Sequence, residues 1–162
     1  MKATELGHII TDYINSKGMR VSPKKLQKLV YYVEAWHLAY FKKSLINEDF
    51  EAWVHGPVVP ELYRDLKQFG YNDIKIIDDE LDAAKERIIK IAGENNLTDD
   101  QVELIYSVLN RYGSLNSFEL EMLTHNEHPW IEARKGFPPH ERCKNVISKD
   151  KMKEFYSSQL AL

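Results

Sequence analysis

The stretch SPKKLQKLVYYVEAWHLAYF, residues 22–41, decides the fold class of this chain. Ser22 is a residue type that caps helix N-termini, and Pro23 suits the first helical position because it has no N–H and a fixed φ. Apolar and aromatic side chains then recur at helical spacing over about five turns. They are Leu26, Leu29, Val30, Val33, His37, Tyr40 and Phe41. A stripe of this length predicts the central helix of a small bundle.

Helical spacing continues on both sides of this segment. Glycine or proline marks most of the expected helix boundaries. Thr98 and Gln101 also have the spacing of a capping box, in which each side chain accepts a hydrogen bond from the other residue's backbone. The remaining helices are expected over residues 6–14, 60–69, 78–91, 98–112 and 117–124, around Trp130, and from Ser148 to Tyr156.

Three short segments have the composition or alternation of β-strands. In residues 50–55 one face holds Phe50, Ala52 and Val54 and the other holds Glu51, Trp53 and His55. The aliphatic face is the better core candidate, and Gly56-Pro57 predicts a turn directly after it. Residues 74–77 and 146–147 are the other strand candidates. The predicted fold is mainly α (α+β), a single domain over residues 1–162 with a helical bundle and a small sheet.

Length and composition agree with a folded domain. The chain has 162 residues, of which 43% are hydrophobic and 29% charged, and this excludes a disordered protein. With 22 Lys and Arg against 25 Asp and Glu, the net charge of −3 gives no global attraction to nucleic acid or anionic lipid. No apolar run is long enough to span a membrane, and the N-terminus lacks the apolar region of a signal peptide, so we expect a cytoplasmic protein.

No pattern for catalysis or metal binding stands out. His125, His128, His140 and Cys143 could form a zinc set, but Pro129 interrupts the first pair and structural zinc sites usually contain more than one Cys. Hydrogen-bonding roles are the better interpretation of these histidines, and Cys143 is expected to be a solvent-exposed bystander. Nucleotide-binding loops and nucleophile motifs are absent from the sequence. We therefore expect no metal, no cofactor and no enzymatic activity.

Three lysines, Lys24, Lys25 and Lys28, lie in the first turns of the central helix. Cations there oppose the helix dipole, which costs some stability. An acidic partner, a phosphate backbone or acidic side chains of the same chain could compensate them. The alternative is a solvated helix face, which the net negative charge favours over a nucleic-acid recognition helix.

The segment from Trp53 to Tyr63 combines large aromatic side chains with a stiff turn. Pro57 fixes its own φ, and Gly56 permits close approach of other groups. Stiff loops of this kind either cover a core or form a preorganised contact surface. The residues alone leave these two interpretations open.

Three blocks of sequence resemble the Panacea domain family, which includes SocA-like antitoxins and phage-associated proteins. They are residues 26–31 (LQKLVY), 51–63 (EAWVHGPVVPELY) and 124–130 (THNEHPW) followed by Ala133-Arg134. The blocks occur in the family's order. One departure is His55, because the family often has Tyr before Gly-Pro, and any contact made by a tyrosine hydroxyl there is in doubt.

The resemblance implies an antitoxin that neutralises a cognate protein toxin, encoded by an adjacent gene, through direct binding. Two alternatives are an adaptor that delivers a bound partner to a protease and a nucleic-acid-binding regulator. Residues expected to bind the partner are Lys24, Lys25, Lys28, Trp53, His55, Gly56, Pro57 and Tyr63. Other residues of the family motifs are expected to have a structural role: Leu26, Gln27, Tyr31, Thr124, His125, Pro129 and Trp130.

Overall fold

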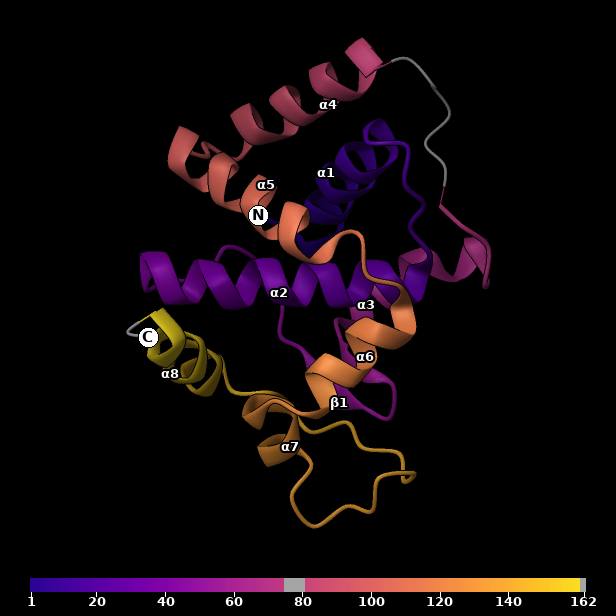
Figure 1. Cartoon of the computed structure of the whole chain (residues 1–162), viewed down its shortest axis with the longest axis vertical. Helices are drawn as coiled ribbons and strands as arrows, with labels where there is room; N and C mark the ends of the chain where they lie inside the picture. The colour runs from indigo at the N-terminus through magenta and orange to yellow at the C-terminus, as the bar shows by residue number, and fades with distance from the viewer. Residues whose placement is uncertain (75–80, 161–162) are drawn as a thin grey trace.

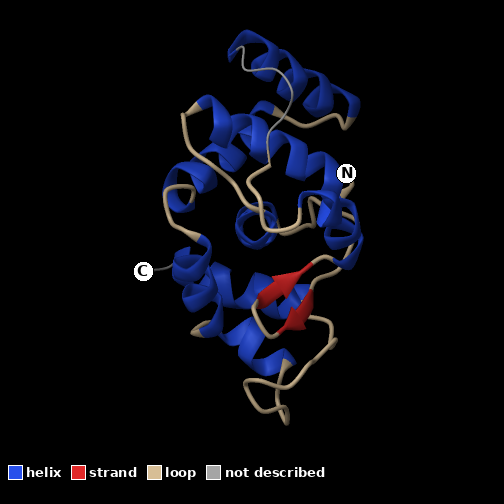
Figure 2. Cartoon of the chain, turned by 90° about the vertical axis from the view of Figure 1, so that its right-hand side faces the viewer, coloured by secondary structure: helices blue, strands red, loops and turns tan. Residues whose placement is uncertain are grey.

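One long helix, α2 (Pro23–Phe41), runs through the middle of the protein, and the other helices pack around it (Figures 1 and 2). The computed structural model describes residues 1–74 and 81–160. Figure 2 looks along α2, which appears end-on and enclosed by the surrounding elements. The mainly α fold with a small sheet is confirmed.

The ends of α2 are those that the sequence predicts. The Ser22 hydroxyl accepts a hydrogen bond from the Lys25 backbone N–H at 3.2 Å, and Pro23 occupies the first turn. At the other end Lys42 adopts a left-handed conformation with φ of 62°, and its N–H donates to the Leu38 carbonyl. The helix ends at Lys42, because a residue that continues an α-helix must have a negative φ.

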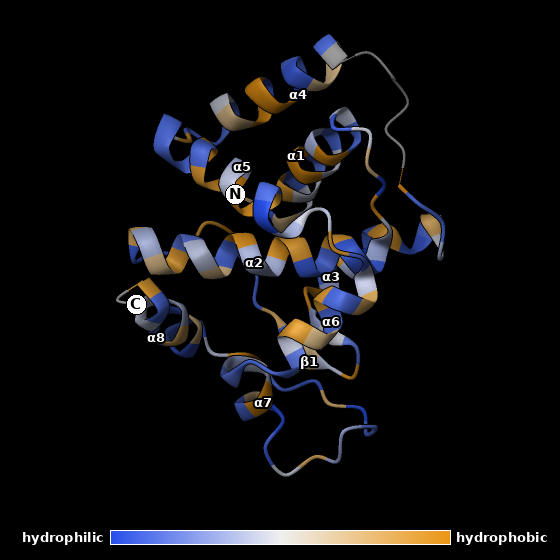
Figure 3. Cartoon of the chain, viewed as in Figure 1, coloured by the Kyte–Doolittle hydropathy of each residue, from blue (hydrophilic) through white to orange (hydrophobic). Residues whose placement is uncertain are grey.

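The helix α2 is buried on all sides and not only along the predicted apolar stripe. Every residue from 25 to 39 is buried, on all sides of the helix. Tyr40 was expected on the apolar stripe but is exposed, because it lines an open groove where α2, α5 and the end of α8 meet. Figure 3 shows apolar and polar residues mixed along α2, so polar side chains are also enclosed. These are Lys25, Gln27, Lys28, Glu34 and His37.

The other helices lie in two groups on either side of α2 (Figure 1). The first contains α1 (Ala3–Ser16), α4 (Leu81–Glu94) and α5 (Asp99–Tyr112). The second contains α6 (Ser117–His125), α7 (His128–Ala133) and α8 (Lys149–Leu160), while α3 (Pro60–Leu66) packs against α1 and α2 and continues into the short 3-10 helix η1 (Lys67–Phe69). The capping box of Thr98 and Gln101 is present, and Ser148 caps α8. Residues 78–80, expected to open α4, lie outside the described residues. No helix in residues 1–74 or 81–160 is long and apolar enough to cross a membrane.

The sheet is a hairpin of two short antiparallel strands, β1 (Glu51–Trp53) and β2 (Gly56–Val58). The predicted turn at Gly56-Pro57 is wrong, because Gly56 pairs with Trp53 and Pro57 with Ala52, which leaves Val54 and His55 as the turn. Proline is tolerated in an edge strand because it lacks only an N–H that the ladder does not use there.

The other two strand candidates do not add regular strands among the described residues. Val146 forms an isolated bridge with Glu51, and the Ile147 N–H donates to the Phe50 carbonyl at 2.8 Å. Of residues 74–77, only Ile74 is described, and its N–H donates to the Val21 carbonyl. Residues 75–77 lie outside the described part of the chain.

A buried carboxylate attaches the segment after α2 to the core. Glu34 is fully buried, and its two oxygens accept hydrogen bonds from the backbone N–H groups of Leu45 at 2.8 Å and Ile46 at 2.9 Å. The Lys149 ammonium lies 3.5 Å from the same carboxylate and donates to the Ile46 carbonyl. Burial raises the pKa of Glu34, which these donors and the lysine partly offset. The turn before the hairpin and the start of α8 therefore depend on this one side chain.

We predict that Glu34→Gln destabilises the fold by about 2 kcal/mol. A glutamine carbonyl can accept from one of the two N–H groups, but its NH2 faces the other donor and leaves it unsatisfied in the core. Urea unfolding measures the loss, with Glu86→Gln on the exposed side of α4 as the control. Equal unfolding free energies for the two variants would show that Glu34 does not hold this segment.

Candidate protein-binding surface at the hairpin and α6

Hydrogen bonds from a side chain of α2 fix the backbone at the end of the hairpin. The side-chain amide of Gln27 accepts from the Val59 N–H at 3.0 Å and donates to the Val59 carbonyl at 3.2 Å. Gln27 is buried, so these two bonds are made away from water. The family-motif residues Leu26 and Tyr31 are also buried, and the Tyr31 ring packs against Phe50 directly before β1.

A second set of side chains fixes the hairpin from α7. The Trp130 indole N–H donates to the Trp53 carbonyl at 2.9 Å, and the Arg134 guanidinium donates to the Ala52 carbonyl at 2.8 Å. The His125 ring stacks on Trp130 with a centroid distance of 4.0 Å, and Pro129 is buried beside them. Thr124 is fully buried and donates its hydroxyl hydrogen to the Glu121 carbonyl. The hairpin is therefore held in one position relative to both α2 and α7.

The side chains at the tip of this fixed hairpin face outward. Trp53 is half-buried, and its ring contacts the ring of the exposed Tyr63 on α3 at a centroid distance of 5.0 Å. His55 is mostly exposed, and its Nδ1 lies 2.7 Å from a carboxylate oxygen of Glu121 on α6. Gly56 and Pro57 are buried beneath them. The hairpin tip thus connects α3 on one side with α6 on the other.

An apolar ridge on α6 continues this surface. Phe118 is 66% exposed and Met122, four residues later on the same helix face, is 43% exposed. Glu121 is next to Met122, which brings the ridge to the His55 contact. We call Trp53, His55, Tyr63, Phe118, Glu121 and Met122 the hairpin–α6 face. The ridge was not predicted from the sequence, although Phe118 and Met122 are out of phase with the buried Leu120 and Thr124 on the same short helix.

The three lysines of the first turns of α2 have different environments. Lys24 is exposed, whereas Lys25 is buried and its ammonium donates to the Gly113 carbonyl at the end of α5. Lys28 is 2% exposed and lies between β2 and α6. Burial lowers the pKa of Lys28 from its ordinary value of 10.5 to about 8, although the Glu121 carboxylate acts in the opposite direction. Of these three lysines, only Lys24 is exposed to solvent, so they do not form a solvated basic helix face.

A model of the family described as "Antitoxin SocA-like, Panacea domain" matches residues 26–131. The chain belongs to this family. Over 62 residues it is 34% identical to the protein named Antitoxin SocA from Caulobacter vibrioides (strain NA1000 / CB15N), a match that covers 38% of this chain and 33% of that protein. The chain thus spans about a third of this relative's length. No solved structure gives a significant match.

The description of the family and the name of this relative both refer to antitoxins. The matched range contains the hairpin, α3 and all of α6. Lys28 falls inside this range, while Lys24 and Lys25 precede it.

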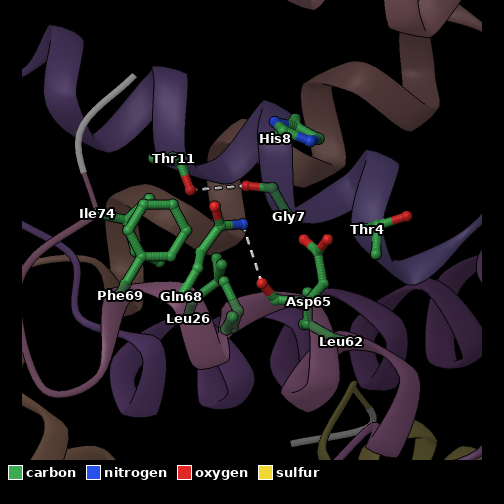
Figure 4. A pocket seen from close by; sticks show the side chains of 11 residues that line it. Thr4, Gly7, His8, Thr11, Leu26, Leu62, Asp65, Gln68, Phe69 and Ile74 are labelled. Atoms are coloured by element: carbon green, nitrogen blue, oxygen red, sulfur yellow. Dashed lines mark hydrogen bonds between the residues drawn. The ribbon is translucent and has the colours of Figure 1, made fainter. Parts of the chain in front are cut away.

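Two hollows elsewhere on this Panacea domain differ from the hairpin–α6 face. The first is a cavity of about 80 Å³ between α1 and α3, lined by Gly7, Thr11, Leu62 and Phe69 among others (Figure 4). A drug-sized or cofactor-sized ligand needs a few hundred Å³, so this cavity is too small for one. The second is a groove of about 650 Å³ where α2, α5 and the end of α8 meet. Its wall at Leu160 lies outside the residues that the family model matches.

The residues considered as a zinc set do not converge. His125 stacks on Trp130, and His128 instead contacts Glu132 on the next turn of α7 at 2.7 Å. Cys143 was expected to be exposed but is buried, and its sulfur accepts a hydrogen bond from the Asn145 N–H at 3.4 Å. Within the described ranges, no group of three or more His, Cys, Asp or Glu side chains could hold a metal ion.

We predict that Lys28→Met stabilises the folded protein at pH 7. The lowered pKa means that the folded state binds the lysine proton less well than the unfolded state does, and a shift from 10.5 to about 8 corresponds to about 3 kcal/mol. Methionine has a similar shape and carries no charge to desolvate.

The pH dependence follows from the same shift. Unfolded chains keep this proton up to pH 10.5, so the wild-type free energy of unfolding rises relative to that of Lys28→Met between about pH 8 and 10.5. Urea unfolding of both proteins at several pH values measures the difference. A less stable variant at pH 7 would mean that the ammonium has a stabilising partner within the fold.

Proposed function

We propose that this chain is an antitoxin that neutralises a cognate protein toxin by binding it directly, and that the hairpin–α6 face is the surface that contacts the toxin. The chain acts as one domain over residues 1–162, in the cytoplasm, on the product of an adjacent gene. Family membership supports the class of function, and the geometry of the face supports the mode of action.

The observation that carries the proposal is the exposure of aromatic and apolar side chains on a fixed frame. Trp53, Tyr63, Phe118 and Met122 are of the residue types that supply most of the energy of protein interfaces. Hydrogen bonds from Gln27, Trp130 and Arg134 hold the hairpin that connects them. A face that is already ordered loses little conformational entropy on binding, which favours affinity.

The same geometry argues against a nucleic-acid-binding role for the start of α2. Nucleic acids are bound by several exposed cations that neutralise successive phosphates. Lys25 and Lys28 are buried, and the Lys25 ammonium already donates to a backbone carbonyl. These lysines therefore do not form a basic surface.

The decisive experiment is co-expression of the chain with the product of the neighbouring gene. We predict that the toxin alone stops growth and that the unchanged chain restores it. The double variant Phe118→Asp/Met122→Asp places two charges in the centre of the proposed interface and should weaken toxin binding about a hundredfold, with loss of rescue.

The control is Ile89→Asp, which puts one charge on an exposed apolar residue of α4, on the other side of α2. It should rescue growth as the unchanged chain does. Because all three positions are exposed, the purified variants should keep their melting temperatures. Full rescue by the α6 double variant would place the toxin elsewhere, and a toxin that disappears only when a cellular protease is present would favour an adaptor.

A further inference from the structure

The side chain of Lys28 runs through a passage that requires a glycine in the hairpin. Gly56 has φ of 112°, and a Cβ placed there would lie 2.5 Å from Cε of Lys28 and 3.1 Å from Oγ1 of Thr124. Such a Cβ would overlap the lysine stem, so Gly56 is needed both for its backbone conformation and for the space it leaves. The stem of Lys28 is thus enclosed between β2 and α6, directly beneath the hairpin–α6 face.

The ammonium at the end of this stem has no partner in the described part of the chain. The Lys25 ammonium has a carbonyl and the Lys149 ammonium has Glu34, but no described group forms a hydrogen bond or an ion pair with Lys28. The nearest charge that favours its protonation is Glu121, and that carboxylate is held by His55. The Lys28 Nζ is not one of the fully buried polar atoms without a partner, so the ammonium keeps some contact with solvent at the surface. A lysine enclosed to this degree without a partner is still rare in folded proteins.

We propose that the ammonium of Lys28 pairs with a carboxylate that the toxin presents at the hairpin–α6 face. This inference rests on the proposed function and names the chemistry of the partner. A single enclosed ammonium suits one compact anion, whereas a nucleic-acid backbone needs a row of exposed cations. A toxin seated on the hairpin–α6 face would exclude water from the pair and strengthen it.

Pairing of this kind makes toxin binding depend on pH. The charged or titratable groups near Lys28 are Glu121 and His125 from α6 and Lys24 from α2, and Glu121 is itself contacted by His55 from the hairpin turn. Above the pKa of about 8 the free lysine loses its proton and must regain it to bind a carboxylate. Toxin affinity should therefore fall by up to about tenfold per pH unit between pH 8 and 9.

The test compares three forms of the full chain in titrations with the purified product of the neighbouring gene. We expect Lys28→Met to bind at least about thirtyfold more weakly than the unchanged chain, because the carboxylate of the toxin would be left without a partner. The matched control Lys85→Met removes an exposed lysine from α4 and should bind within about threefold of the unchanged chain. Melting temperatures of all three show that the forms are folded.

The pH profile separates a direct contact from a structural role. Only the forms that retain Lys28 should lose affinity between pH 8 and 9, and Lys28→Met should show a flatter profile. Binding by Lys28→Met as tight as by the unchanged chain would overturn the pairing while leaving the antitoxin function intact. A failure of the unchanged chain to bind or to rescue growth would overturn the proposed function, and the pairing with it.

Discussion

Burial of α2 on all sides from residue 25 to residue 39 is the constraint on which the rest of the structure depends. A helix enclosed on all sides cannot leave its polar side chains unpaired without a large loss of stability, so each must find a partner on a surrounding element. Most of the partners are backbone groups of segments that lack regular structure. Gln27 bonds Val59, Glu34 bonds Leu45 and Ile46, Lys25 bonds Gly113, and His37 bonds Lys43. Hydrogen bonds from one helix thereby position the hairpin, the segment before it and the end of α5.

Lys28 is the exception to this pattern, and it lies beneath the hairpin–α6 face, the surface that we propose binds the toxin. Gln27 and Lys25 are satisfied inside the fold, while the side chain of Lys28 is buried beneath the hairpin–α6 face and its ammonium has no partner among the described residues. If the chain binds its partner as proposed, a group that is costly alone and satisfied in a complex gives selectivity for the correct partner. Phe118 and Met122 would contribute apolar area that is buried in the interface, and Lys28 would favour a partner that presents a carboxylate at this position.

The sequence was sufficient to predict the helices with clear caps and strong periodicity, as at Ser22 and Thr98, because these signals are local. It placed the hairpin turn wrongly because Gly-Pro is a common turn dipeptide, and only pairing with β1 shows that Pro57 lies in a strand. Periodicity treats lysine as a surface residue, so the burial of Lys25 and Lys28 depends on tertiary packing that no local pattern carries. The ridge on α6 was missed because a nine-residue helix with apolar side chains on two faces gives no distinct period.

Amide hydrogen exchange of the chain with and without its toxin tests the central claim most directly. Exchange reports which backbone segments become protected, and it needs no substitution that could disturb the fold. The account predicts slower exchange in the complex for residues 53–63 and for α6, with no change in α4. Protection confined to α4, or to the groove between α5 and α8, would contradict the assignment of the hairpin–α6 face as the toxin-binding surface.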